Sequence, residues 1–338
     1  MVFMDNIRGV NLGGWLVLEK WISPSVFSGT EATYEYSLMR ELGHEAALTR
    51  LSAHRDNFIT ETHIDSLQNQ GIKGLRLPVG YWLFEDADGF AGGGDLYVDR
   101  LFSWAEERAM SIVLCFHAAP GSQNGWDHSG RAGDIAWATP NNIRLSYDFL
   151  DRLTKSYGHR KALVGIELLN EPHWSLSLET LFEFYKVAGV LVRQNCHHGV
   201  SVIVSDSFRP QETLKLLPQL SIDGLILDCH LYQLFTDEDR ALDLAGHVKK
   251  ATGWSRELSR YKRRQPVVVG EWSAAMSELY GPSLQRKRFN YTTDDYVVYV
   301  RAQREAFERA GVSWFYWTAR TEDRGIWSLL DHPELLSQ

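Results

Sequence analysis

Short apolar runs alternate with longer amphipathic stretches along the whole chain. The short runs are rich in Val, Ile and Leu and have the length of buried strands, whereas the longer stretches repeat their apolar positions with helical spacing. The predicted strands are residues 8–16, 71–79, 110–118, 163–170, 200–206, 225–232, 266–272 and 311–318. The predicted helices are residues 56–70, 99–108, 141–157, 178–196, 242–260 and 293–310, with a weaker helix around 210–220.

Regular alternation of strands and helices is typical of a parallel sheet. Eight strands in 338 residues, with no internal repeat and no Pro/Gly/Ser-rich linker, predict an α/β fold in which residues 1–338 form a single (β/α)8 TIM barrel. A doubly wound open sheet is the alternative, because it has the same alternation. Thr139-Pro140 and Gly311 supply the start and stop signals expected of two helices.

Charge and hydropathy narrow the possible partners. The chain has 35 Lys and Arg against 43 Asp and Glu, a formal charge of -8, so no nucleic-acid partner is expected. No apolar run approaches the roughly 18 residues of a membrane span, so no membrane partner is expected, and we expect a monomer. Residues 1–5 lack the basic and apolar segments of a signal peptide. We therefore expect a cytoplasmic protein if the chain is complete, and a secreted one if a signal peptide has been removed.

Aromatic and polar side chains mark the chemistry. The chain contains 12 Trp, whose wide faces suit sugar rings but also fill cores. In a barrel of this kind, catalytic groups come from the carboxyl ends of the strands. The polar or aromatic residues at or beyond the predicted strand ends are Glu19, Arg76, His117, Asn170, Glu171, His230, Tyr232, Glu271 and Trp317.

Two of these residues, Glu171 and Glu271, follow or end strongly apolar runs, where a buried carboxyl group needs a partner or a function. Two carboxyl groups across one barrel mouth can divide the work of a retaining glycosidase, one as acid and one as nucleophile. The two groups should then lie roughly 5 to 5.5 Å apart.

Longer motifs around these residues resemble a known family. Asn170-Glu171-Pro172 and Gly270-Glu271-Trp272 are similar to the acid/base and nucleophile motifs of glycoside hydrolase family 5. Residues 7–19, 75–82 and 117–127 resemble the fungal exo-β-1,3-glucanases of that family. The resemblance covers nearly the whole chain, and it implies a β-glucan, an oligosaccharide or a β-glucoside as substrate.

The resemblance also implies a role for each matching residue. Glu171 would be the acid/base and Glu271 the nucleophile. In these roles we expect Arg76 to contact Glu271 and keep it ionised, and burial and Glu271 to raise the pKa of Glu171. The supporting residues would be Arg76, His117, Asn170, His230 and Tyr232. The residues that hold the sugar at subsite -1 would be Glu19, Asp127 and Trp317. Trp126 and Phe235 would form an aromatic clamp at the entrance.

Some features depart from the exo-glucanases and leave alternatives open. Residues 273–291 are shorter than the corresponding loop and lack its cysteines, and Ala319 stands where those enzymes tend to have a second Trp. An endo-β-glucanase or a diglycoside-specific β-glycosidase is therefore an alternative to release of glucose. A non-catalytic carbohydrate-binding barrel is a third, although it has no use for two glutamates. No complete metal-binding motif is present, and we expect neither a metal nor a cofactor.

Overall fold

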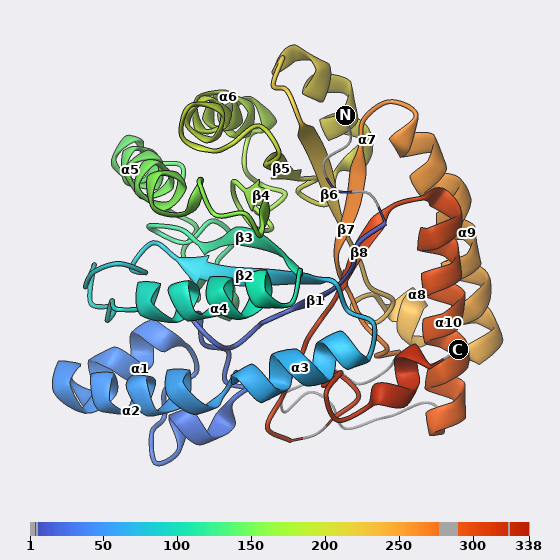
Figure 1. The fold of residues 1–338 in the computed structure, drawn as a ribbon, viewed down its shortest axis with the longest axis horizontal. Coiled ribbons are helices and arrows are strands. Elements are labelled where there is room, and N and C mark those ends of the chain that lie inside the picture. The colour runs from blue at the N-terminus through green and yellow to red at the C-terminus, as the bar shows by residue number, and fades with distance from the viewer. Residues whose placement is uncertain (1–3, 5, 277–289, 324, 338) are drawn as a thin grey trace.

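The computed structural model describes residues 4, 6–276, 290–323 and 325–337 (Figure 1). The strands are β1 (Arg8–Asn11), β2 (Gly74–Gly80), β3 (Ser111–Ala118), β4 (Leu163–Glu167), β5 (Ser201–Ser205), β6 (Leu225–Leu231), β7 (Val267–Trp272) and β8 (Ser313–Tyr316). The helices are α1 (Glu35–Leu42), α2 (His44–Asn57), α3 (Glu61–Asn69), α4 (Asp95–Glu107), α5 (Pro140–Tyr157), α6 (Leu178–Asn195), α7 (Pro210–Leu216), α8 (Asp237–Arg240), α9 (Leu244–Lys262) and α10 (Thr293–Ala310).

The eight strands of the described residues form one closed parallel barrel in chain order. β1 closes the barrel by pairing with β2 at Gly9↔Gly74 and with β8 at Gly9↔Phe315. Helices surround the strands on the outside (Figure 1). The predicted TIM barrel is confirmed, and the open-sheet alternative is wrong because β1 and β8 are hydrogen-bonded neighbours.

Helix ends follow the expected local chemistry in part. The Thr139 side chain accepts a hydrogen bond from the Asn142 backbone N–H at the start of α5, and Gly311 ends α10 in the left-handed conformation. The sequence pattern missed α1 and α2, and the helix predicted for residues 56–70 begins at Glu61 in the structure.

The lower half of the barrel interior, at the amino ends of the strands, is apolar. Its packed residues are Met4, Val113, Ile203, Ile226, Val268 and Phe315. Phe315 takes up much of the space, since a Cβ added to Gly9 would lie 2.2 Å from its ring and one added to Gly74 would lie 3.0 Å from it. At Gly74 the nearest atom is a side-chain carbon of Ile7, 2.4 Å from the added Cβ, so Phe315 excludes a side chain at Gly9, and mainly Ile7 excludes one at Gly74.

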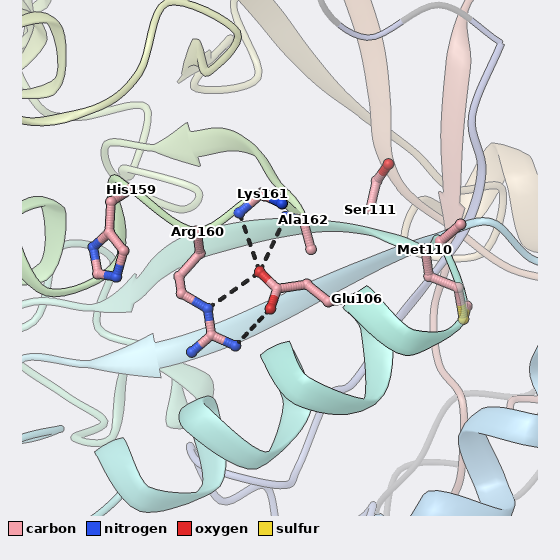
Figure 2. A pocket seen from close by; sticks show the side chains of 8 residues that line it. Glu106, Met110, Ser111, His159, Arg160, Lys161 and Ala162 are labelled. Carbon is pink, nitrogen blue, oxygen red and sulfur yellow. Dashed lines mark hydrogen bonds and ion pairs between the residues drawn. The ribbon is translucent and has the colours of Figure 1, made fainter.

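A hollow of about 600 Å³ opens at this same amino end, between the α4–β3 and α5–β4 connections (Figure 2). Glu106 accepts hydrogen bonds there from the Arg160 side chain and from the Lys161 backbone N–H. Arg160 and the amide dipoles lower the pKa of Glu106, so the contact joins the two connections as an ion pair. In the described part of the chain, no helix is both long and apolar enough to cross a membrane.

Candidate active site

The two predicted catalytic glutamates face each other at the carboxyl end of the barrel. Glu271 lies inside β7, while β4 ends at Glu167 and Glu171 lies in the loop beyond it, with a left-handed φ of 40°. One oxygen of each carboxyl group lies within 4.8 Å of the other, and both lie within this distance of a ring nitrogen of His230. This close approach is nearer to the roughly 5 to 5.5 Å that separates the carboxyl groups of retaining glycosidases than to the roughly 6.5 to 9.5 Å of inverting ones.

Arg76 supports Glu271 from inside the barrel. Its Nη1 lies 2.9 Å from Oε1 of Glu271, and the hydroxyl of Tyr232 donates to Oε2 at 2.9 Å. The guanidinium group of Arg76 is 1% exposed, pairs with Glu167 at 2.8 Å and donates to Oδ1 of Asn170 at 2.7 Å. The predicted contact between Arg76 and Glu271 is confirmed.

Two histidines contact Glu171. Nδ1 of His230 lies 2.6 Å from Oε1 of the carboxyl group, and Nε2 of His128 lies 3.3 Å from Oε2. The side chain of Asn124 donates to the backbone carbonyl of Glu171 at 3.2 Å, which holds the loop against the β3 side of the mouth.

The charges of this cluster depend on one another. Burial lowers the pKa of His230, but the carboxylates of Glu271, Asp228 and Glu171 outweigh burial and raise that pKa well above its usual value. Burial raises the pKa of Glu171, but attraction to His230 and the hydrogen bond with it leave the pKa below its usual value. The expectation of a raised pKa for Glu171 is therefore wrong for this structure, because a proton on His230 stabilises the carboxylate.

The pKa of Glu271 is shifted in the opposite direction. Burial raises this pKa and Glu171 raises it further, while His230 and Arg76 offset only part of the shift. Glu171, His230 and Glu271 lie so close together that the charge of each depends on whether the other two are protonated. The three side chains therefore titrate together and not independently.

The residues predicted to hold the sugar lie on both sides of the glutamates. Burial, and then the nearby Asp127 carboxylate, raise the pKa of Glu19 well above its usual value, and a carboxyl oxygen of Glu19 accepts a hydrogen bond from Trp21 at 2.9 Å. The ring of Trp317 stacks nearly parallel to that of His117, with 5.6 Å between centroids. Burial lowers the pKa of His117 well below its usual value, which keeps this ring neutral.

The two residues predicted for the aromatic clamp have different neighbours. The ring of Phe235, which is 54% exposed, packs edge-on against that of Tyr232 at 5.3 Å. The ring of Trp126 lies 5.5 Å from that of His128 and 5.9 Å from those of both Trp174 and Phe208. Trp126, Trp174 and Phe208 thus form an aromatic rim that leads outward from the Glu171 side.

Sequence reasoning missed several residues of the site. One is Asn11, whose Oδ1 accepts a hydrogen bond from Nη1 of Arg76 at 2.7 Å. The others are Asn124, His128, Glu167, Trp174, Phe208 and Asp228. Glu167 and Asp228 had a signal that could have found them, since each is a carboxylate inside an otherwise apolar strand. Trp174 and Phe208 are loop residues, and nothing in their sequence context indicates that they approach Trp126.

Two clusters of the described residues have ligand atoms close enough to hold a metal ion: Glu171, His230 and Glu271, and Glu167, Asp228 and His230. Both share His230, whose raised pKa favours a proton on the ring. The Arg76 guanidinium also lies against Glu167 and Glu271. A protonated histidine cannot ligate a metal ion through that nitrogen, and both it and the guanidinium group repel a cation, so we assign no metal to either cluster.

Two proteins of similar sequence are named as glucan 1,3-beta-glucosidases, and one protein of similar structure is a rutinosidase. The chain is 32% identical to the probable glucan 1,3-beta-glucosidase A of Aspergillus fumigatus, over 96% of this chain and 85% of that protein. It is 33% identical to the glucan 1,3-beta-glucosidase of Pichia angusta, over 96% of this chain and 84% of that protein. The structure is similar to the rutinosidase from Aspergillus niger, with a TM-score of 0.83, 22% identity and 99% of each chain covered.

The family signature covers most of the barrel. The profile described as "Cellulase (glycosyl hydrolase family 5)" matches residues 39–323, which include both glutamates. This match agrees with the closed barrel and with the relatives named above. The chain belongs to glycoside hydrolase family 5 and is a glycoside hydrolase.

Proposed function

We propose that this enzyme hydrolyses β-glucosidic bonds with retention of configuration, by a double displacement in which residues 1–338 act as a single catalytic domain. Glu271 attacks the anomeric carbon, and Glu171 protonates the leaving oxygen and later takes a proton from water. The carrying observation is the close approach of the two carboxyl groups, within 4.8 Å between oxygens. Inverting enzymes need roughly 6.5 to 9.5 Å.

The neighbours of each glutamate support these roles. Arg76 and Tyr232 direct hydrogen bonds at Glu271 and stabilise the ionised form that attacks. The proton for the leaving group is held by Glu171 and His230, whose atoms are 2.6 Å apart. Activity should therefore fall at low pH as Glu271 is protonated, and at high pH as the Glu171–His230 pair loses its proton.

Two buried polar atoms without partners among the described residues support sugar binding beside Glu271. Nδ2 of Asn170 and Nε2 of His117 are buried and have no hydrogen-bond partner there. Oδ1 of Asn170 already accepts from Arg76, so its amide nitrogen is left to donate to a sugar hydroxyl. We propose that Asn170 and His117 bind hydroxyls at subsite -1, together with Glu19, Asp127 and Trp317.

The loop after β1 supports exo action. Glu322 accepts hydrogen bonds from the backbone N–H and the hydroxyl of Ser25 at 2.8 and 2.6 Å, and the ring of Trp21 lies 5.3 Å from that of Trp327. The loop is thus held against the segment beyond β8 and can wall off the space past subsite -1. Together with the names of the relatives, this supports release of glucose from the ends of β-1,3-glucans or from β-glucosides.

The leaving-group side supports binding of an extended partner. We propose that Trp126 and Phe235 flank the sugar or aglycone at subsite +1. Trp174 and Phe208, 53% and 40% exposed, continue the aromatic rim beyond Trp126. This exposed extension favours, as a second candidate, an enzyme that acts on disaccharide glycosides or inside longer chains. The shortened segment 273–291, which prompted that alternative, lies mostly outside the described residues.

Product analysis tests specificity directly. Laminari-oligosaccharides, cello-oligosaccharides and aryl disaccharides should be compared, with glucose as the only early product from laminari-oligosaccharides. Early di- and trisaccharides with little glucose would contradict exo action. NMR of the first product should show the β-anomer, whereas an initial α-anomer would contradict retention.

We also propose that the reaction uses neither a metal nor a cofactor, and that a monomer acts on the glucan, oligosaccharide or β-glucoside. Carboxylates and hydrogen bonds alone can stabilise the oxocarbenium-like transition state. Activity should survive dialysis against a chelator, and a reversible loss restored by a divalent cation would contradict this part of the proposal.

A further inference from the structure

Asp228 is a buried carboxylate that none of the roles above uses. It lies on the inner side of β6 between Ile226 and His230, because alternate residues of a strand point to the same side. The residue is 1% exposed. Its Oδ1 accepts a hydrogen bond from the Gly270 N–H at 2.6 Å, and its Oδ2 lies 3.4 Å from Nε2 of His230.

Asp228 and His230 are placed so that each can serve as the hydrogen-bond partner of the other. Oδ2 of Asp228 and Nε2 of His230 are both buried, neither has a hydrogen-bond partner among the described residues, and the two atoms lie 3.4 Å apart. A buried carboxylate needs a donor, and the group bound at one ring nitrogen of a histidine determines what the other nitrogen can do. Nε2–H directed at Asp228 leaves Nδ1 facing Glu171 at 2.6 Å.

We propose that Asp228 is a positioning residue, which orients the His230 ring and retains on it the proton that Glu171 delivers to the leaving group. The inference rests on the proposed function. As the C–O bond breaks, Glu171 gives its proton to the leaving oxygen, and Nδ1 of His230 supplies that proton to Glu171. When water attacks the glycosyl-enzyme, Glu171 takes a proton from it and returns one to Nδ1. Nε2–H of His230 stays directed at Asp228 throughout.

Asp228 also reaches the other catalytic strand. Gly270 precedes Glu271 in β7, and its N–H is held by Oδ1 of Asp228. A Cβ at position 270 would lie 2.0 Å from Oδ2 of Asp228, so this contact requires glycine. One carboxylate thus fixes the histidine beside Glu171 and the peptide next to Glu271.

Other charged groups also act on His230. Glu171 lies beyond β4, Glu271 on β7 and Asp228 on β6 itself, while Glu167 and His117 act from β4 and β3. Asp206, beyond β5, interacts with His230 electrostatically but forms no ion pair with it among the described residues. Burial raises the pKa of Asp206 to about 7, so Asp206 carries its negative charge on the alkaline side, where the test is made, and is a control for loss of a buried charge nearby.

The test compares Asp228→Asn with Asp206→Asn. Asparagine keeps an oxygen for the Gly270 N–H and removes the charge next to His230. On an aryl glucoside with a poor leaving group, Asp228→Asn should move the alkaline limb of kcat/KM about one to three pH units lower. Asp206→Asn should move it less, and a dinitrophenyl glucoside, whose departure needs no proton, should not reveal the shift. An unchanged limb, or equal shifts in both variants, would overturn the inference.

A measurement on the unaltered enzyme covers the case in which Asp228→Asn does not fold. Nitrogen-15 NMR of the His230 ring should show a proton on Nε2 across the active pH range, and a bare Nε2 at neutral pH would overturn the inference. Glu171→Gln distinguishes a failure of the Asp228 inference from a failure of the proposed function. If Glu171→Gln keeps full activity on poor leaving groups, the proposed function is wrong, and the inference fails with it. If it loses that activity while Asp228→Asn shifts nothing, only the role of Asp228 is wrong.

Discussion

The two halves of the barrel interior are built by the same strands but do different work. Along β6, Ile226 belongs to the apolar lower cluster, whereas Asp228 and His230, on the same side of the strand, belong to the charged upper half. Burying apolar groups stabilises the fold, but burying charges costs stability unless each is paired. The comparison indicates that the lower half offsets the cost of holding several ionisable groups together in the upper half.

The largest effect should come from removing one charge of the upper half. Glu271→Gln should lower kcat by at least about 10⁴-fold, because glutamine cannot form the glycosyl-enzyme. Its free energy of unfolding should change by less than about 2 kcal/mol, because Arg76 keeps its pair with Glu167. Kinetics with a chromogenic β-glucoside and denaturant unfolding measure both. Glu106→Gln, at the opposite end of the barrel, should keep full activity, and turnover by Glu271→Gln would favour a different nucleophile.

The second glutamate should show an effect that depends on the substrate. Glu171→Ala should lose about 10² to 10⁴-fold on glucosides with poor leaving groups and far less on activated aryl glucosides, which leave without a proton. Added azide should restore activity to this variant by replacing water in the second step. If azide rescues Glu271→Ala and not Glu171→Ala, the two roles are reversed.

The lower half should respond in stability and not in chemistry. Phe315→Ala should lower the free energy of unfolding by about 3 to 5 kcal/mol, because it leaves a cavity among packed side chains. The kcat of the folded fraction should stay within about twofold, since Phe315 lies in the cluster below the charged groups. Val298→Ala, at a 46% exposed position, is the control and should change stability by less than about 0.5 kcal/mol. A large loss of kcat in folded Phe315→Ala would mean that the two halves are coupled.

The smallest effect should come from the outer rim. Trp174→Ala should lower kcat/KM about two- to tenfold on a laminari-tetrasaccharide and leave a methyl glucoside unaffected, because one aromatic stacking contact is lost. Leu96→Ala, at a 54% exposed position on α4, controls for loss of a surface apolar group. Equal losses on both substrates would place Trp174 outside the leaving-group side.

The strands were predictable because buried parallel strands are nearly continuous apolar runs. The apolar runs, however, extend beyond the ends of the strands. The first run was expected to reach residue 16, but β1 ends at Asn11, and Leu12 and Leu16 are buried in the loop that follows. Hydrophobicity reports burial, and it cannot distinguish a buried strand from a buried loop.

The helix α2 was missed for a related reason. The buried face of α2 includes His54 and Arg55, which the pattern counts as polar. His54 pairs with the Gly14 carbonyl at 2.8 Å, and Arg55 donates to the Gly92 carbonyl at 2.7 Å. A helix buried through hydrogen bonds to loop carbonyls shows no apolar stripe in its sequence.

The two glutamates and Arg76 were predictable because motifs and strand ends place them. The pKa directions of Glu171 and Glu271, opposite to those expected, could not be predicted from the sequence, since they depend on His230 lying 2.6 Å from one carboxyl group and 3.5 Å from the other. Such distances arise from side chains on several strands. The sequence therefore predicted which residues form the site. Which of Glu171, His230 and Glu271 holds a proton could be inferred only from their positions in the folded barrel.

The ring of Phe315 has a consequence for how the sequence of this barrel can drift during evolution. Gly9 on β1 and Gly74 on β2 leave the volume that this ring occupies, so an alanine at Gly9 is excluded while Phe315 is present. A smaller residue at 315 would remove that obstacle and at the same time leave a void that an added methyl group could fill. Substitutions at positions 9 and 315 are thus expected to be accepted jointly, with each change tolerated only in the background of its partner.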